Sequence, residues 1–568
     1  MQPGSEASVI EQPRSELLPF EIASAAKTRT DMASGSHSLE GAPGDEEVPL
    51  IDTGHPTSTE GDIELGRQNS AKRQPRTKLG LLPLVALIFY EVSGGPFGTE
   101  DAVTSAGPLI ALLGFLILPF VWSVPEALVT AELATAFPED SGYVAWVTAA
   151  FGPFWGFQEG WWSWLSGVTD NSVYPVLFLS YLDAVVPGLL EGWTRGVTLF
   201  TVSILLSYLN YRGLTIVGRA AIGMTLFIVL TFLVLIGLSI PRLHPSNWLV
   251  VDLGTVEWRP FINVMFWNLN YWDSVSTLAG EVASPAKTFP RALFMAVGLV
   301  IFMYVAPLAA CLGVMSEAGD WKLGFFATVA QKVGGSWLAW WMLAAAAVSQ
   351  IGQFEAEMSS DSFQLLGMAE RGFLPACLAR RSRHGTPTLA IILSSVGICT
   401  LSMFDFRQIV ELLNIVYCLA ELTEFAAFIH LRVSAPHLRR PFRVGLPTWG
   451  CVLMLTPATM LLLTLIVQPI LDLDIMVMGW TAGAMVAGAV MYPLLRLARR
   501  KEWCRFVGQD PHEYKVALRG GVPQSPSITA FSAVYGPMSD DESDEAAQRA
   551  VAGQLNGQAP GQPSGGVL

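Results

Sequence analysis

Long apolar segments limit the fold of this chain more than any other feature. Twelve of them, most of about the 20 residues that cross a bilayer as a helix, run between residues 79 and 495. With 51% hydrophobic and 14% charged residues among 568, the composition is that of a multi-pass membrane protein. We therefore predict an all-α membrane fold with twelve transmembrane helices. The predicted spans are 79–104, 108–136, 154–186, 194–211, 214–240, 260–283, 290–314, 325–357, 387–404, 408–430, 447–467 and 473–495.

The two ends of the chain are polar. Residues 1–77 and 502–568 lack a sustained apolar period and are rich in Gly, Pro, Ser and acids, a composition typical of disorder. We predict a disordered tail at 1–77, a twelve-span domain at 78–501 and a mostly disordered acidic tail at 502–568. Glu46–Ile51 reads EEVPLI and resembles an acidic dileucine sorting signal, which would recruit a sorting adaptor. Such a short match can also arise by chance.

The distribution of Lys and Arg predicts the orientation. An even number of spans puts both ends on one side, and cytosolic flanks carry the excess of basic residues. With the amino end inside, 22 Lys and Arg residues flank the spans on the cytosolic side and six on the other. No cleavable signal peptide begins the chain. We expect cytosolic termini in a multi-pass protein of the plasma membrane, with an internal membrane as the alternative.

The first apolar segment is interrupted by residues that break helices. Tyr90–Asp101 reads YEVSGGPFGTED, in which Gly94, Gly95 and Pro96 follow one another. Unpaired backbone groups at bilayer depth survive only where they are buried in protein or line a wet cavity. We therefore predict a broken helix beside a transport site. The alternative is a Gly/Pro kink between packed helices.

Carboxylates without basic neighbours are concentrated in the first third of the membrane domain. No Lys or Arg occurs between Leu79 and Thr194. Yet four acids lie inside apolar runs there, namely Glu91, Glu126, Glu159 and Asp170. A buried, unpaired carboxylate must be protonated or find a cation. This pattern predicts a path for positively charged solutes. The alternative is that some of these acids are neutral and hydrogen-bonded to backbone.

Aromatic and polar side chains accompany these acids. Asp170 and Tyr174 are four residues apart and share one helix face, and an acid beside an aromatic ring can bind a cation. The sixth segment places Asp273 among aromatic and amide side chains. In the eighth, Glu357 lies on one helical stripe with Gln350 and Gln353. Tryptophans near the end of a span are otherwise typical of an interfacial belt.

Five separated stretches resemble one known family. LVALIFYEVSGGPFG, PEALVTAELATAFPEDSGYVAW, FGPFWGFQEG, NYWDSVSTLAGEVASPAKTFPRAL and MAERGFLP followed by HGTP are similar to the amino acid-polyamine-organocation transporters. Within that superfamily they are most similar to the plant polyamine uptake transporters, which are L-type amino acid transporter-like. The resemblance covers roughly Lys78 to Arg500. It implies a LeuT-like fold of two inverted five-helix repeats plus two helices, with spans one and six interrupted around a central site.

The resemblance also implies roles for residues of the third and sixth spans. Compared with the bacterial arginine/agmatine antiporter of the superfamily, Trp267 falls on the tryptophan that covers the substrate. Asp273 falls on its acidic gate. Asn171 and Tyr174 fall on residues of its pocket.

Two further matches bear on the substrate. Gly94 and Gly95 match the unwound glycine motif, but Pro96 follows and removes a backbone N–H from the segment that holds a carboxylate in amino acid carriers. Glu357 falls where the antiporter has an aromatic contact to substrate. An amino acid needs donors for its carboxylate, whereas a polyamine needs separated carboxylates and aromatic faces. The residues therefore favour a polyamine.

We predict proton-coupled uptake of polyamines by alternating access, with putrescine, spermidine or spermine as substrate. The resemblance adds paraquat-like dications. Asp170, Asp273 and Glu357 would hold amines, Trp267 and Tyr174 would cover the alkyl chain, and Glu91 or Glu159 would carry the coupling proton.

The alternatives are an amino acid exchanger or permease of the same superfamily, or a channel. No nucleophile–base pair or metal-ligand cluster is apparent, and the six cysteines are scattered. We therefore expect neither an enzyme nor a metal or cofactor. The expected partners are the organic cation, protons and the lipid bilayer, and no nucleic acid.

Overall fold

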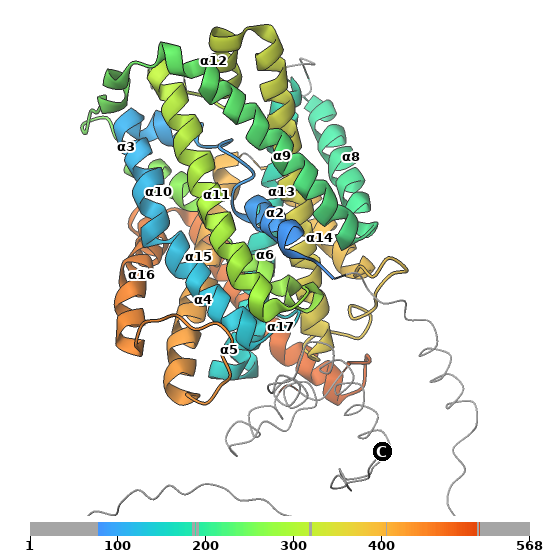
Figure 1. Ribbon diagram of the computed structural model, residues 1–568. Helices are drawn as coiled ribbons and strands as arrows, with labels where there is room; N and C mark the ends of the chain where they lie inside the picture. Colours follow the sequence, from blue (N-terminus) through green and yellow to red (C-terminus); the bar gives the residue numbers. More distant parts are fainter. Residues whose placement is uncertain are drawn as a thin grey trace, which may run out of the picture. The chain divides into compact units, whose positions relative to one another are not determined.

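The computed structural model describes residues 78–183, 188, 192–316, 321–404, 406–507 and 511, with the side chains of 406 and 407 excepted (Figure 1). The predicted tail at 1–77, its sorting signal and nearly all of the tail at 502–568 therefore fall outside the described part of the chain.

The described residues form helices and contain no β-strand, and their regular contacts outside helices include the isolated bridges Leu79–Val282 and Pro375–Phe506. The α-helices are α2 (Leu81–Val92), α3 (Glu100–Val121), α4 (Ser123–Ala136), α5 (Tyr143–Phe151), α6 (Pro153–Asn171), α7 (Val173–Asp183), α8 (Gly192–Tyr211), α9 (Leu214–Ser239), α10 (Trp258–Trp267), α11 (Pro285–Val314), α12 (Phe325–Gly334), α13 (Ser336–Glu370), α14 (Thr388–Leu401), α15 (Phe406–Ser434), α16 (Thr448–Leu471) and α17 (Ile475–Arg500). Three 3₁₀ segments are η1 (Ile240–Arg242), η2 (Pro245–Leu249) and η3 (Ser274–Glu281).

The first apolar segment is broken where its glycines predict. α2 ends at Val92 and α3 begins at Glu100. Between them Gly94 and Gly95 have φ angles of 62° and 119°, which residues with a Cβ rarely adopt. A Cβ on Gly94 would also stand 2.6 Å from the side chain of Gln353. The break is therefore held by both backbone conformation and close packing.

A second break separates α10 from η3. α10 ends at Trp267 and η3 begins at Ser274. No glycine or proline causes this break. Instead Tyr271 has a φ of 67°, and its N–H donates to the Tyr417 hydroxyl on α15 at 2.9 Å. A tertiary hydrogen bond thus supports a backbone conformation that tyrosine seldom adopts alone.

Both breaks lie inside the helix bundle. α2 packs against α9, α11 and α13, and Figure 1 shows it enclosed by these helices. Every residue of α2 from Leu84 to Val92 is buried. Helices α8, α16 and α17 instead expose large apolar side chains such as Leu205, Leu453 and Val486, as expected of surfaces that face lipid.

Six helical stretches within the described residues are long and apolar enough to cross a membrane. They are Glu100–Ala136, Leu214–Arg242, Pro285–Val314, Gln408–Ser434, Thr448–Leu471 and Ile475–Arg500. Other predicted spans are shortened by the breaks, as in α2 and α10, or carry buried polar side chains, as in α6 and α13. The chain is thus a mainly helical membrane protein, whereas the count of twelve spans and the inverted repeats stay predictions.

Candidate substrate site

A small closed cavity lies where the two breaks meet α6 and α13. Its empty volume is about 200 Å³. Its lining residues are all buried, none more than 5% exposed. They are Glu91, Val92, Ser93, Asp170, Tyr174, Trp267, Asn268, Tyr304 and Gln353. A larger hollow of about 930 Å³ lies between α8 and α14, but no carboxylate or basic side chain lines it, so charged-solute chemistry belongs to the smaller cavity.

Asp170 is held in place by two aromatic donors. Trp267 Nε1 donates to its Oδ1 at 2.7 Å, and the Tyr174 hydroxyl donates to its Oδ2 at 2.7 Å. The i, i+4 spacing predicted the second contact. Trp267 in turn packs on the first break, because a Cβ on Gly98 would stand 2.8 Å from its ring. The carboxylate therefore has neutral partners and two aromatic rings around it.

Three further carboxylates, on α2 and α13, lie at the cavity or close to its lining residues. Glu91 lines it, Glu357 lies against Glu91, and Asp361 is one helical turn beyond Glu357. One oxygen of each has no hydrogen-bond partner among the described residues. A Cβ on Gly167 of α6 would stand 2.2 Å from Asp361 Oδ1 and 2.9 Å from Glu357 Oε1. These two carboxylates therefore meet the bare backbone of α6.

Asp361 is a residue that the sequence analysis missed. It continues the stripe of Gln350, Gln353 and Glu357 by one more turn, so extending that stripe would have found it. Within the described residues no Lys, Arg or His forms an ion pair with any of these four carboxylates. The two carboxylates that line the cavity, Glu91 and Asp170, and the two beside them therefore have no ion-pair partner among the described residues.

Asn171 and Asp273 do not line the cavity. The side chain of Asn171 turns away from Asp170, because consecutive helix residues point about 100° apart, and it donates to the Phe354 carbonyl at 3.4 Å. Asp273 is the last residue of the second break, next to η3. Its Oδ1 is 2.9 Å from the Tyr417 hydroxyl, which also contacts Glu126 and Glu421.

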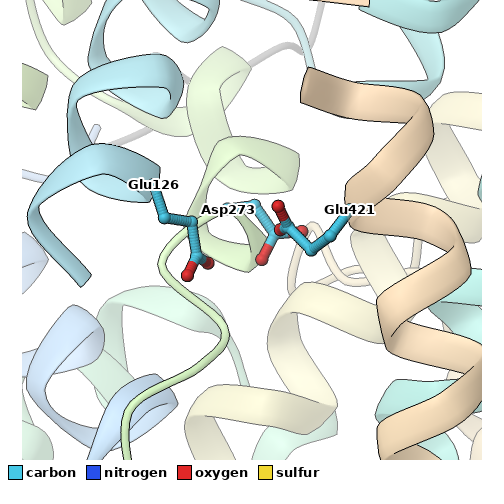
Figure 2. Close-up of side chains that lie close together, drawn as sticks. All are labelled: Glu126, Asp273 and Glu421. Carbon is cyan, nitrogen blue, oxygen red and sulfur yellow. The ribbon is translucent and has the colours of Figure 1, made fainter. Parts of the chain in front are cut away.

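Figure 2 shows Glu126, Asp273 and Glu421 extending from α4, the second break and α15 into one space. One oxygen from each lies within 4.8 Å of the others. Glu126 stood out in sequence as an acid in an apolar run, whereas Glu421 lies in the apolar first part of α15 and was missed. The cluster forms only because three distant segments pack together.

Glu159 is buried on α6 but lies outside the cavity lining. Ser163 donates to its Oε1 at 2.9 Å, and the Thr423 hydroxyl donates to its Oε2. Glu424, one residue after Thr423, lies beside it. Glu159 thus belongs with the acids of α15 and not with Asp170.

Ionic and backbone contacts close the bundle at the end that carries the α4–α5 loop. Arg381 binds Glu281 at 2.6 Å and Asp140 at 2.9 Å. The start of α2 is tied to the end of η3, because Leu79 N donates to the Glu281 carbonyl at 2.8 Å. Burial and the neighbouring carboxylate of Glu281 raise the pKa of Asp140 to about 7, although the Arg381 guanidinium acts in the opposite direction.

Contacts at the opposite end also limit access. Arg259 on α10 binds Asp474, Asp472 and Glu411 at 2.9, 3.0 and 3.2 Å. Glu100 at the start of α3 accepts from Gly98 N at 2.8 Å and Gly324 N at 3.2 Å. Because these contacts close the bundle at both ends, the cavity is occluded.

A helical membrane bundle with two interrupted helices around an occluded polar cavity is the architecture of a membrane transporter. The family model described as "Amino acid permease" matches residues 79–490. The chain belongs to the amino acid permease family.

Close relatives have names that refer to transport. The polyamine transporter PUT1 of Oryza sativa subsp. japonica is 50% identical over 452 residues, covering 79% of this chain and 84% of its own. The polyamine transporter RMV1 of Arabidopsis thaliana is 48% identical over 468 residues, covering 81% and 95%. A protein of Arabidopsis thaliana named "Probable polyamine transporter" is 52% identical over 446 residues, covering 78% and 92%. The resemblance inferred from the five sequence stretches is thereby confirmed, and these names indicate a transporter of the permease family in place of an enzyme.

Proposed function

We propose that the protein takes up polyamines across the plasma membrane by alternating access, driven by protons. In this proposal twelve spans with two inverted five-helix repeats carry the site, and both termini are cytosolic. Putrescine, spermidine and spermine are the proposed substrates, and the family resemblance adds paraquat-like dications. The observation that carries the proposal is the group of four unpaired carboxylates, Glu91, Asp170, Glu357 and Asp361, around the occluded cavity.

The charges of the cavity fit an amine-bearing solute. Acids in contact in a low-dielectric site cannot all ionise unless a cation joins them. A polyamine brings two or more ammonium groups, and each donates up to three hydrogen bonds. Asp170 and Glu357 bind the amines in this proposal, while Trp267 and Tyr174 cover the alkyl chain. Asp273 lies outside the cavity lining, so its role is argued separately below.

The backbone of the first break favours a polyamine over an amino acid. Gly94 N donates to the Phe89 carbonyl at 2.9 Å, and Gly95 N donates to Ser93 Oγ at 3.1 Å. Gly98 N donates to Glu100 Oε2, and Pro96 has no N–H. These donors are engaged within the protein, so they do not offer themselves to a substrate carboxylate.

In this proposal Glu91 or Glu159, the two candidates from the sequence, is a group through which the coupling proton passes to the cytosol. Glu91 lines the cavity and would compete directly with an amine for charge. Glu159 lies apart from the cavity and could titrate while the amine is bound. In either case release of the proton to the cytosol would favour the inward-facing state. A sorting adaptor at Glu46–Ile51 would direct the protein to its membrane.

Asp170→Asn tests the proposal in cells that lack polyamine transport. The amide keeps hydrogen-bonding capacity but removes the charge, so we expect spermidine uptake to fall at least about tenfold, the effect of ~1.4 kcal/mol or more, at equal surface expression. Collapse of the proton gradient should stop accumulation by the native protein. Unchanged uptake by the variant would remove Asp170 from the site. If the protein were instead an amino acid exchanger, leucine or arginine would compete with labelled spermidine for uptake.

A further inference from the structure

The Tyr417 hydroxyl lies among three carboxylates that the cavity does not use. It is 2.7 Å from Glu126 Oε1, 2.9 Å from Asp273 Oδ1 and 3.0 Å from Glu421 Oε1. All are hydrogen-bonding distances. Each of the three acids is at most 2% exposed. The cluster therefore forms a hydrogen-bonded group sealed from water.

Counting hydrogens shows that this cluster needs extra positive charge. A tyrosine hydroxyl has one hydrogen to donate, and its oxygen accepts here from Tyr271 N. One carboxylate can receive the hydroxyl hydrogen. In the other two contacts the hydroxyl oxygen faces a carboxylate oxygen with no hydrogen between them, unless the carboxyl group is protonated and supplies one. At least one of the three acids must therefore be protonated, or the group must bind a cation.

Unpaired atoms support the same conclusion independently. Glu126 Oε2 and Glu421 Oε2 have no hydrogen-bond partner among the described residues, and both side chains are 99% buried. The basic residues that approach these helices are already engaged, because Arg432 and Arg440 bind Glu132, six residues beyond Glu126. Among the residues that the structure describes, no other titratable group that faces the cluster is basic. These groups are Glu91 on α2, Tyr143 on α5, Glu159 on α6, Tyr271 in the second break, and Cys418 and Glu424 on α15.

The size of the space decides the kind of cation. The hydroxyl oxygen of Tyr417 already fills the region between the three carboxylates, at 2.7–3.0 Å from each. An ammonium group or a metal ion would have to displace it, whereas a proton needs no additional room. We propose that Glu126, Asp273 and Glu421, arranged around Tyr417, store the coupling proton of this carrier. This inference rests on the proposed proton-driven uptake and names the site of coupling.

The second helix break connects this proton site to the substrate cavity. At one end of the break Trp267 donates to Asp170. At the other end Trp272 N donates to Glu126 Oε1 at 2.8 Å. An amine that binds Asp170 competes with Trp267 and shifts the segment that supplies these donors. Losing an N–H donor disfavours the charged carboxylate, so substrate binding and protonation of the cluster are linked.

A route for release leads away from the cavity. Glu424 lies one turn from Glu421 on α15 and beside Glu159. Because α4 and α15 end beyond these acids at the proposed cytosolic side, a proton leaving Asp273 or Glu421 would pass to Glu424 and Glu159 and then to the cytosol. This order retains Glu159 as a member of the coupling path.

Purified protein in vesicles that contain a pH-sensitive dye tests this assignment. Glu126→Gln and Glu421→Gln keep the shape of the side chain but cannot release a proton. We expect each variant to lose at least about 90% of spermidine-driven proton entry and of accumulation against a gradient, because coupling requires the titrating group. Exchange of labelled for unlabelled spermidine, without a pH gradient, should stay within about twofold of the native rate, because Asp170 and its neighbours are unchanged.

Glu355→Gln is the matched control. Glu355 is as deeply buried as the cluster acids, at 2% exposed, but it lies on α13 beside α8. There the Asn210 side chain donates to the backbone carbonyl of Glu355. It should keep both coupled entry and exchange. Retained exchange also shows that a cluster variant is folded. Glu126→Gln and Glu421→Gln should give the same result, because both remove a titrating group from the same cluster.

Each other result overturns the assignment. Accumulation by both cluster variants at the native level would remove the proton from this site. If the cluster variants lost both exchange and accumulation, the cluster would be a site that binds an ammonium group of the substrate. Loss of native activity on chelation of divalent metals, restored by adding Ca²⁺, would make it a metal site. Absence of proton entry with the native protein would instead refute proton coupling itself, and with it the proposed function.

Discussion

Gly167 is a residue whose missing side chain makes room for the site. Asp361 Oδ1 and Glu357 Oε1 both approach the space that a Cβ would fill. Gly167→Ala should displace these carboxylates at a cost of about 1–3 kcal/mol. We expect spermidine uptake to fall about tenfold, with the helix retained, since alanine is the better helix former. Transport assays at matched surface expression measure this effect.

Gly223 on α9 provides the control for this substitution. No atom lies within 4 Å of a Cβ added there. Gly223→Ala should therefore leave uptake unchanged. Equal loss of uptake in both variants would mean that the helix backbone, and not the carboxylate pair, is what Gly167→Ala disturbs.

Individual residues were predicted from sequence to the extent that local spacing controls them. Asp170 and Tyr174 share a face because of the helical repeat, and the structure brings them together. Asn171 is adjacent in sequence, yet it points away for the same geometric reason. Glu421 was missed because its importance depends on its contact with Glu126 and Asp273. Both of these residues are far from Glu421 in the sequence, and only the folded chain brings the three together.

The two broken helices differ in how their breaks arise. The first is encoded locally by Gly94 and Gly95, so sequence alone located it. In the second, Tyr271 is held at positive φ by Tyr417. Local sequence contains no equivalent signal, and only the resemblance to a known family implied that break. Tertiary contacts determine what local propensity leaves open.

The group of charges at the α4–α5 end predicts a pH-dependent closure. One guanidinium, Arg381, binds three carboxylates there, those of Asp140, Glu281 and Glu370. The pKa of Asp140 is about 7 in this closed arrangement and returns toward its ordinary value of 3.8 when the end opens to water. Protonation of Asp140 therefore stabilises closure fully below about pH 3.8, and this stabilisation is lost progressively until the pH has risen through about 7.

The accessibility of a cysteine measures this closure. Ala279→Cys places a thiol on η3 behind the charged group, in a protein whose native cysteines are replaced. Raising the pH on that side from about 6 to about 8 should increase its modification severalfold, beyond the intrinsic rise in thiolate reactivity. The background is the same variant carrying Asp140→Asn, which should show only the intrinsic rise. Equal pH dependence in both proteins would contradict the role of Asp140.

At the scale of the whole molecule, the orientation can be tested directly. The proposed twelve spans would place both ends and the α4–α5 loop in the cytosol, and they would place the η2 segment outside. Epitope tags at either end should bind antibody only after the membrane is permeabilised. A tag inserted after Gly254, in the exposed connection between η2 and α10, should bind in intact cells. Opposite exposure of the two ends would require an odd number of spans.

In the proposed function, the carboxylates at the occluded cavity bind the ammonium groups of an amine-bearing solute. Binding of labelled spermidine to the purified protein, in competition with unlabelled spermidine, leucine and arginine, tests it most directly. We expect saturable binding of labelled spermidine that unlabelled spermidine displaces and leucine does not. Arginine should displace it weakly, because the backbone donors that could bind its carboxylate are engaged within the protein. Displacement by leucine, or absence of saturable spermidine binding, would contradict it.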